Sequence, residues 1–394
     1  MSGVLAGVKI LELSHFVAGP FCGQILGDMG AEVTKVERPK IGDAGRSFYA
    51  TINGESTYYA SFNRNKKGIT INMKDRRGQK IFRQLAAEAD ILVENYKPGF
   101  LDQIELGYKD LSRVNPKLVM VSISGFGSDG PYKNKPALDM VVQAMSGLMS
   151  VNGEPDGMPL RTANVVSDFT TGLYGAISAL GALQHQRQTG EGQHVEVAML
   201  DATISIMENF LTNWFMLQRD TPRAGNQRPT TAPGNVYKAQ DGMIYIAAQP
   251  NAHYTRLCKL MGRTDLMDEE LYSSSEKRLQ YKNYLDEEIG KWAAQFDIES
   301  LESLLDKHGI PNGPVKNIAQ VCGDEHLKYR GSFAEIDHPV IGKITVPGIV
   351  PRFSKTPGSV RYAPPLLGQH NEEVLAGLGY SKEEIKNLIQ TEAI

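Results

Sequence analysis

The chain has 394 residues, more than one ordinary hydrophobic core holds, so we expect two domains. Hydrophobic residues make up 41% and charged residues 22%, which is typical of a soluble globular protein, and a net charge of −3 gives no broad basic surface for nucleic acid or an anionic membrane. The three cysteines, Cys22, Cys258 and Cys322, lie far apart, which argues against a disulfide framework or a zinc site.

The chain also lacks the common targeting and metal-binding patterns. Residues 1–8 contain no basic patch followed by an apolar core, so they do not look like a signal peptide. No apolar run reaches the roughly 18 residues that cross a bilayer. Neither an HExxH motif nor clustered Cys and His residues appear. We therefore expect a cytoplasmic protein with no metal, no prosthetic group and no membrane or nucleic-acid partner.

The first part of the chain alternates strands and helices. Val8–Leu13 is predicted to be a strand, Phe21–Met29 a helix that ends at Gly30, and Ala31–Glu37 the next strand. The pattern continues with a helix at Arg77–Ala89 and with strands at Ile91–Asn95, Lys117–Ile123 and His194–Met199. Such alternation predicts an α/β fold, with a parallel sheet and helices on both faces.

A polar segment rich in Arg, Thr and Pro, Asp220–Gly234, marks the expected domain boundary. Beyond it, Asn235–Ala248 is predicted to form a hairpin around Asp241 and Gly242. Helices follow near Tyr254–Met261, Tyr281–Gln295 and Ile298–His308. This change of pattern predicts a smaller α+β domain.

Polar side chains follow three strands of the predicted sheet. His15 comes after the first strand, Arg38 after the second, and Asn95, Tyr96 and Lys97 after the Ile91 strand. Ligands of open α/β sheets bind at this edge, and these groups suit an anion such as a phosphate. Each residue alone is equally well explained as a solvated loop residue.

Asp168 begins an apolar run, up to Leu183, that has helical spacing. An N-cap is the simpler interpretation, since Asp is a preferred capping residue. The sequence has no GxSxG elbow, so covalent chemistry, if any, would fall to a carboxylate. The GxGxxG match at Gly125–Gly130 is followed by Pro131 rather than by a helix, so we interpret it as a loop.

Taken together, several segments resemble the class III CoA-transferases, the CaiB/BaiF family, which includes formyl-CoA:oxalate and carnitine CoA-transferases. The resemblance covers nearly the whole chain. It is carried by Leu5–Leu13, Ala18–Pro20, Gly30–Glu37, Asn63–Lys67, Val93–Gly99, Gly125–Gly127, Gln143–Gly147, Asp168–Gly172, Thr189–Gln193 and Pro365–Gly368.

The resemblance implies an acyl-CoA:carboxylate CoA-transferase with Asp168 as the nucleophile, acting through aspartyl anhydride and aspartyl-CoA thioester intermediates. The helix N-terminus would keep this carboxylate ionised. The resemblance further implies that coenzyme A or acyl-CoA binds as a substrate along the strand ends. The residues implied for CoA binding are His15, Val17, Ala18, Arg38, Ile71, Asn72, Met73, Lys74, Asn95, Tyr96, Lys97 and Gln103.

The family also implies a domain layout and an assembly. Residues 1–224 are expected to form the first part of a large Rossmann-like, CoA-binding domain, residues 225–330 a small domain, and residues 331–394 a return to the large domain. The expected assembly is an interlocked homodimer.

The sequence departs from the formyl-CoA enzymes at three places. They have Gln where Val17 stands, Arg where Gln103 stands, and a glycine-rich loop where Ala224–Gln227 has one Gly. These differences count against oxalate or formate specificity but not against the transferase class. A small dicarboxylate is the expected acceptor, because Arg161, Arg219 and Arg223 lie near the motifs; solvated surface arginines explain the pattern equally well.

Two alternatives stay open. The first is a 2-methylacyl-CoA racemase, because racemase relatives share the fold and the aspartate. They use a His-Asp pair where this chain has Leu138 and Asp139, and Leu138 cannot transfer a proton. The second is a non-catalytic acyl-CoA-binding homologue, which the retained Asp168 disfavours.

Overall fold

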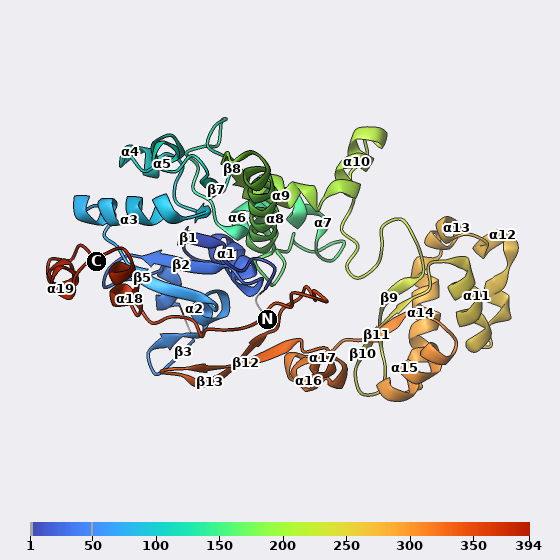
Figure 1. Cartoon of the computed structure of the whole chain (residues 1–394). Coiled ribbons are helices and arrows are strands. Elements are labelled where there is room, and N and C mark those ends of the chain that lie inside the picture. Colours follow the sequence, from blue (N-terminus) through green and yellow to red (C-terminus); the bar gives the residue numbers. More distant parts are fainter. Residues whose placement is uncertain (1–2, 49) are drawn as a thin grey trace. The chain divides into compact units, whose positions relative to one another are not determined.

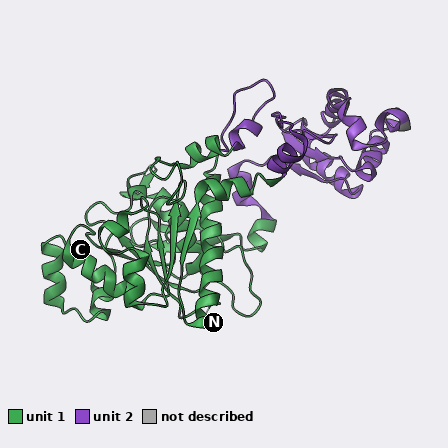
Figure 2. Cartoon of the chain, turned by 90° about the horizontal axis from the view of Figure 1, so that it is seen from above, with its two compact units in different colours: residues 1–146, 163–208, 326–394 green, residues 147–162, 209–325 purple. Residues whose placement is uncertain are grey.

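The computed structural model describes residues 3–48 and 50–394, and the chain divides into two compact units (Figures 1 and 2). Unit 1 comprises residues 1–146, 163–208 and 326–394, and unit 2 comprises residues 147–162 and 209–325. These limits differ from the expected boundaries after residues 224 and 330. Residues 147–162 and 209–224 belong to unit 2, and residues 326–330 belong to unit 1.

Unit 1 is built on a six-stranded sheet in which every neighbouring pair is parallel. In spatial order the strands are β5 (Lys66–Thr70), β2 (Glu32–Glu37), β1 (Lys9–Leu13), β6 (Ile91–Glu94), β7 (Val119–Ser124) and β8 (His194–Ala198). The predicted α/β class is therefore confirmed for the large unit. Five of these strands begin within two residues of their predicted starts; β5 was not predicted.

Helices cover both faces of this sheet (Figure 1). Alternate residues of the buried strands point to opposite faces, so Leu11 packs in one core and Ile10 in the other. The core that contains Leu11 also contains residues of α3 (Arg76–Glu88), α18 (Asn371–Gly377) and α19 (Lys382–Gln390). The core that contains Ile10 also contains residues of α1 (Ala18–Asp28) and α8 (Val166–Thr189).

The C-terminal segment thus completes a core that begins near the N-terminus. Leu375 on α18 and Ile385 and Leu388 on α19 are buried in the same cluster as Leu11 and Phe82. Ser381 caps α19 in a reciprocal capping box with Glu384.

The remaining elements of unit 1 are short. They are η1 (Ala44–Ser47), β3 (Thr51–Ile52), β4 (Glu55–Ser56), α2 (Thr57–Phe62), α4 (Phe100–Gln103), α5 (Tyr108–Val114), α6 (Asp139–Met145), α9 (Met199–Ser205), β12 (Phe333–His338) and β13 (Gly342–Pro347). Two helices, α10 (Glu208–Leu217) and α17 (Glu325–Tyr329), have their first residue in one unit and the rest in the other.

Unit 2 has its own core around a three-stranded antiparallel sheet in the order β11-β10-β9. The pairing of β9 with β10 confirms the hairpin predicted around Asp241 and Gly242. The elements are α7 (Leu148–Val151), β9 (Gly234–Lys238), β10 (Met243–Ala247), α11 (Asn251–Leu260), η2 (Thr264–Met267), α12 (Glu269–Tyr272), α13 (Ser275–Leu279), α14 (Lys282–Ala293), α15 (Ile298–Lys307), β11 (Asn312–Pro314) and α16 (Ile318–Gly323). In the part of the chain that the structure describes, no helix is both long enough and apolar enough to cross a bilayer.

Candidate active site

A cavity of about 710 Å³ lies at the carboxyl ends of the central strands in unit 1. Its walls come from the loops after β1, β6 and β7 and from the first turn of α8, which is where open α/β sheets bind ligands. The wall residues used below are His15, Phe16, Ala18, Phe48, Tyr58, Asn95, Tyr96, Lys97, Gly125, Leu138, Asp139 and Asp168. Gly125–Gly127 lie here in a loop, which confirms that the GxGxxG match does not open a helix.

Asp168 is the third residue of α8 and not its N-cap. Val165 occupies the cap position, and it has no side chain that could accept a hydrogen bond. The expected capping role for Asp168 is therefore wrong. The carboxyl group instead lines the cavity, and the backbone N–H of Ala18 lies near enough to favour its ionised form.

Burial, together with the nearby Asp139 charge, raises the pKa of Asp168 to about 7. The Ala18 N–H opposes both effects. The expectation that the helix N-terminus keeps Asp168 fully ionised is thus wrong. A helix end stabilises a charge by about 0.3–1 kcal/mol, whereas desolvation of a carboxylate can shift its pKa by several units.

Asp139 is a member of the site that the sequence predictions did not include. It is the first residue of α6 and is 3% exposed. Its Oδ1 accepts the Ser167 N–H at 2.8 Å, and its Oδ2 accepts a hydrogen bond from Gln143 Nε2 at 2.6 Å. The i, i+4 spacing of Asp139 and Gln143 was the only local signal for this pair. The structure therefore places a second carboxylate beside the start of α8.

The turn after β1 is held by the carboxyl end of β6. Asn95 Oδ1 accepts the His15 N–H at 2.9 Å, and Asn95 Nδ2 donates to the His15 carbonyl at 2.8 Å. The His15 ring packs edge-on against Phe16 and Tyr96, with centroids 4.8 and 5.1 Å away. Burial lowers the pKa of His15, so the imidazole is neutral at pH 7. It can therefore donate or accept a hydrogen bond without adding charge to the site.

A row of aromatic rings runs from this turn to α8. Neighbouring centroids lie 4.9–5.9 Å apart, within the usual range for aromatic pairs. The row contains Phe16, Phe48, Tyr58, Phe62 and Phe169. Burial, followed by the charge of Asp168, raises the pKa of Tyr58 to about 12. Tyr58 and Phe48 of this row line the same cavity as Asp168.

The structure gathers half of the predicted residues around this cavity. Those that line it are His15, Ala18, Asn95, Tyr96, Lys97 and Asp168. Val17, Ile71 and Met73 are instead buried, and Ile71 and Met73 pack in the sheet core. Asn72 is bonded to the C-terminal residues Glu392 and Ala393. Arg38, Lys74 and Gln103 are exposed and do not line the cavity. Their roles in CoA binding stay predictions.

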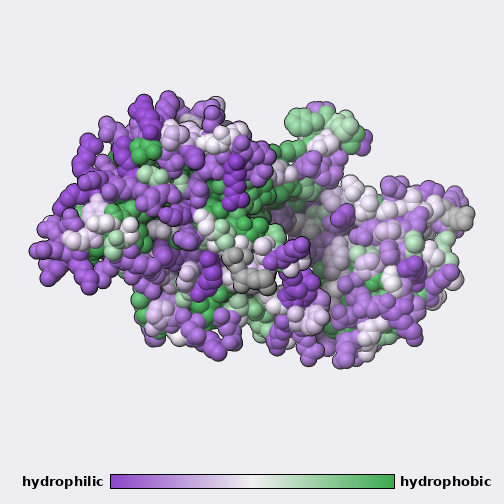
Figure 3. All heavy atoms as spheres, in the orientation of Figure 1, coloured by the Kyte–Doolittle hydropathy of each residue, from purple (hydrophilic) through white to green (hydrophobic). Residues whose placement is uncertain are grey.

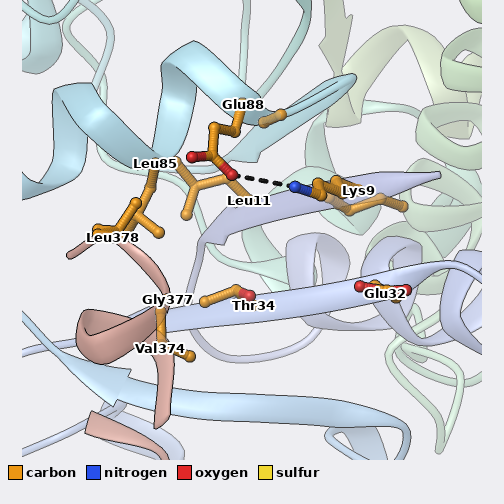
Figure 4. A pocket seen from close by; sticks show the side chains of 11 residues that line it. Lys9, Leu11, Glu32, Thr34, Leu85, Glu88, Val374, Gly377 and Leu378 are labelled. Carbon is orange, nitrogen blue, oxygen red and sulfur yellow. Dashed lines mark hydrogen bonds and ion pairs between the residues drawn. The ribbon is translucent and has the colours of Figure 1, made fainter. Parts of the chain in front are cut away.

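A smaller cavity, about 240 Å³, lies at the opposite edge of the sheet (Figure 4). It contains the first residues of β1 and β2, and Lys9 and Glu88 form an ion pair of 3.0 Å across it. Leu85, Val374 and Leu378 form an apolar wall. Because this cavity lies at the amino ends of the strands, it takes no part in the site around Asp168.

Comparison with known proteins decides the family. A sequence profile described as CoA-transferase family III matches residues 5–371. The chain belongs to CoA-transferase family III. This CoA-transferase is 38% identical to the succinyl-CoA:glutarate CoA-transferase of Mus musculus over 389 residues, which are 98% of this chain and 89% of that protein. The resemblance drawn from the motifs, and the enzyme class with it, is confirmed.

Two further relatives match this transferase over nearly its whole length. The succinyl-CoA--D-citramalate CoA-transferase of Chloroflexus aurantiacus is 34% identical over 387 residues, which are 98% of this chain and 96% of that protein. A crystal structure of a CaiB/BaiF family protein from Brucella suis superimposes with a TM-score of 0.86 at 32% identity, covering 96% of this chain and 100% of that chain. The fold described above is therefore that of the family.

Proposed function

We propose that this transferase moves CoA between a succinyl-type acyl-CoA and a small dicarboxylic acid, with Asp168 as the nucleophile. The observation that carries the proposal is the position of Asp168, a carboxyl group whose pKa is about 7, on the wall of a cavity at the carboxyl edge of the sheet. The names of the two relatives support the choice of substrates, since both proteins are described as transferring CoA from succinyl-CoA to a dicarboxylic acid.

The proposed reaction begins with the ionised form of Asp168. An Asp168 oxygen attacks the thioester carbonyl of the donor, the C–S bond breaks, and CoA leaves as a thiolate, so that a mixed anhydride remains. The thiolate then attacks the aspartyl carbonyl and releases the donor acid, which leaves an aspartyl-CoA thioester. The acceptor carboxylate attacks this thioester and forms a second anhydride. The thiolate finally attacks the acceptor carbonyl, which yields the new acyl-CoA and free Asp168.

The raised pKa suits this role. A poorly solvated carboxylate with a higher pKa is a better nucleophile than one in water, yet about half of it remains ionised at pH 7. The Ala18 N–H lowers the pKa of the carboxyl group and would stabilise negative charge on the aspartyl oxygen in the two steps in which the thiolate or the acceptor carboxylate attacks the aspartyl carbonyl. No step changes an oxidation state, so coenzyme A acts only as a substrate and the reaction needs no prosthetic group.

The CoA phosphates would bind on the basic side of the cavity. Lys97 lies on its wall directly after β6, and the exposed Arg38 follows β2 at the same edge of the sheet. Both offer charged donors to a phosphate. Val17, Ile71 and Met73 would support this region from the core, because their side chains are buried.

The racemase alternative lacks a proton-transfer group. Leu138 is 57% exposed and lines the cavity at the position where the racemases have histidine. Proton exchange at a carbon next to the thioester needs an acid-base group on each face of that carbon. Incubation of the enzyme with a 2-methylacyl-CoA in deuterated water tests this directly, and we expect no deuterium at the α-carbon.

We infer that the protein forms the homodimer typical of its family, in which each chain threads through the other. Green atoms gather over α10 in Figure 3. These apolar side chains support an extensive interface, because Phe215 and Met216 are 74% and 77% exposed. Single exposed apolar residues are common, but a run that also includes Trp214 and Leu217 suits a protein partner. Light scattering of the purified chain should give twice the mass of 43.3 kDa.

Trapping of the covalent intermediate tests the assigned nucleophile. Wild-type enzyme incubated with succinyl-CoA should lose activity when hydroxylamine is added, because hydroxylamine attacks an aspartyl thioester or anhydride. Peptide mapping should place the hydroxamate at Asp168. Enzyme that turns over succinyl-CoA while it resists hydroxylamine would contradict the proposal.

A further inference from the structure

Four buried charged side chains lie beneath the turn that follows β1. They are Glu12 on β1, Lys35 on β2, Lys66 on β5 and Asp43 in the loop after β2, and each side chain is at most 1% exposed. Lys35 Nζ lies 3.1 Å from Glu12 Oε1 and 3.0 Å from Asp43 Oδ2, and Lys66 Nζ lies 2.8 Å from Glu12 Oε2. Buried ion pairs contribute little to stability, because the desolvation penalty offsets much of their attraction. This network therefore calls for another explanation.

Lys35 and Asp43 hold two backbone groups of the turn. Lys35 Nζ donates to the Ser14 carbonyl at 2.8 Å, and Asp43 Oδ1 accepts the Phe16 N–H at 3.1 Å. Lys35 Nζ thus donates hydrogen bonds to Glu12 Oε1 and to the Ser14 carbonyl and forms an ion pair with Asp43 Oδ2. Phe16 has a φ of 64°, which is unfavourable for an aromatic residue and persists only where the surroundings impose it.

The turn leads directly to Ala18, whose backbone N–H acts on Asp168. Ala18 is the first residue of α1, and its N–H favours the ionised form of the Asp168 carboxyl group. Helices α1 and α8 approach closely here, because a Cβ on Gly172 would lie 2.8 Å from the Ala18 carbonyl oxygen. A displacement of the turn would therefore move the Ala18 N–H relative to the reacting carboxyl group.

We propose that Lys35 is a positioning residue of the transfer site, which fixes the turn from Ser14 to Ala18 so that the Ala18 N–H meets the Asp168 carboxyl group. This inference rests on the proposed role of Asp168 as the nucleophile. Lys35 is fully buried and does not line the cavity, so it acts through Ser14 and Asp43 and not on the substrate.

The test compares Lys35→Met with the wild-type full-length enzyme. Methionine keeps the length of the side chain but has no donors for Ser14 or Asp43. We expect the single-turnover rate of Asp168 acylation by succinyl-CoA to fall roughly 100-fold, as is typical for a displacement of about 1 Å at a reacting group. The affinity for CoA should change by less than about threefold, because the cavity wall that binds it is retained.

The pH profile gives a readout that a merely structural role would not move. The Ala18 N–H favours the ionised form of Asp168, so its loss should shift the acid limb of the acylation rate to higher pH. Lys9→Met is the matched control: Lys9 is also a strand lysine in an ion pair, but it lies at the opposite edge of the sheet and is 53% exposed. Lys9→Met should leave both the acylation rate and the acid limb of its pH profile unchanged.

A folded Lys35→Met enzyme with wild-type acylation rate and an unmoved acid limb would overturn the inference. If Lys35→Met does not fold, Asp43→Asn serves instead, since its Oδ1 still accepts the Phe16 N–H while the ion pair with Lys35 is lost. We expect the acylation rate of Asp43→Asn to fall roughly tenfold, with a smaller shift of the acid limb to higher pH. A wild-type rate and pH profile in this variant would contradict the inference. Failure of the wild-type enzyme to form any Asp168 adduct would instead overturn the proposed function, so the two failures are distinct.

Discussion

Asp139 Oδ1 accepts the backbone N–H of Ser167 at 2.8 Å, which places a buried carboxylate beside the residue that precedes Asp168. The Asp139 charge is the second cause, after burial, of the raised pKa of Asp168. The two carboxyl groups line one cavity, so the ionisation of Asp168 is disfavoured by a neighbour of like charge. Asp139 thus acts on the ionisation of Asp168 while its hydrogen bond holds the first turn of α8.

Asp139→Asn separates these two effects. Asparagine Oδ1 can still accept the Ser167 N–H, but the negative charge is gone. We expect the acid limb of the Asp168 acylation rate to move to lower pH by roughly one unit. Asp201→Asn, which removes an exposed carboxylate from the first turn of α9, is the control and should leave the limb in place. An unmoved limb in folded Asp139→Asn would show that the charge has no influence.

The wild-type enzyme should show a single ionisation near pH 7 in acylation. Burial raises the pKa of Asp168 to about 7, and only the ionised form attacks the thioester. The rate constant should therefore rise about tenfold per pH unit below this value and level off above it. Stopped-flow measurement of thiolate release under single-turnover conditions follows the step. A rate that is flat from pH 5 to 8 would contradict the shifted pKa.

Asp168→Asn should raise the stability of the folded protein above pH 7. In the folded state the carboxyl group keeps its proton up to about pH 7, whereas in the unfolded chain it loses it near pH 4, so stability falls as pH rises between these values. Asparagine removes that loss, and we expect a gain of roughly 4 kcal/mol at pH 8. Chemical denaturation at pH 4 and pH 8 checks this. An equal effect at both pH values would contradict it.

Lys97→Met should weaken acyl-CoA binding and leave the chemistry intact. The ammonium group lies on the cavity wall and is proposed to contact a CoA phosphate. We expect KM for acyl-CoA to rise roughly tenfold with kcat nearly unchanged, and the difference to shrink at high salt. Lys117→Met, an exposed lysine just before β7, provides the control. A fall in kcat with unchanged KM would place Lys97 in the chemical step instead.

Local sequence pattern was sufficient to predict five of the six strands of the large sheet, and the resemblance of several segments was sufficient to predict the family. The strands around Ile10 and Ile91 are short, apolar and bounded by glycine or polar turns, so their type follows from local composition. The residues directly after them, His15 and Asn95, meet at the cavity because parallel strands end at one edge. This part of the site therefore follows from the topology alone.

The environment of Asp168 could not be predicted from the sequence in the same way. Its raised pKa depends on burial and on Asp139, 29 positions earlier, and neither follows from local spacing. The limits of unit 2 also differ from the expected boundaries, because residues 147–162 join it from within the first half of the chain. Such long-range placements need the folded structure.

The covalent adduct on Asp168 tests the central claim most directly. Intact-protein mass spectrometry of the enzyme mixed with succinyl-CoA alone should show a species heavier by one CoA thioester, and peptide mapping should place it on Asp168. Asp168→Ala should still bind CoA but show neither the adduct nor turnover. Transfer of CoA by Asp168→Ala, or an adduct on another residue in the wild-type enzyme, would contradict the account.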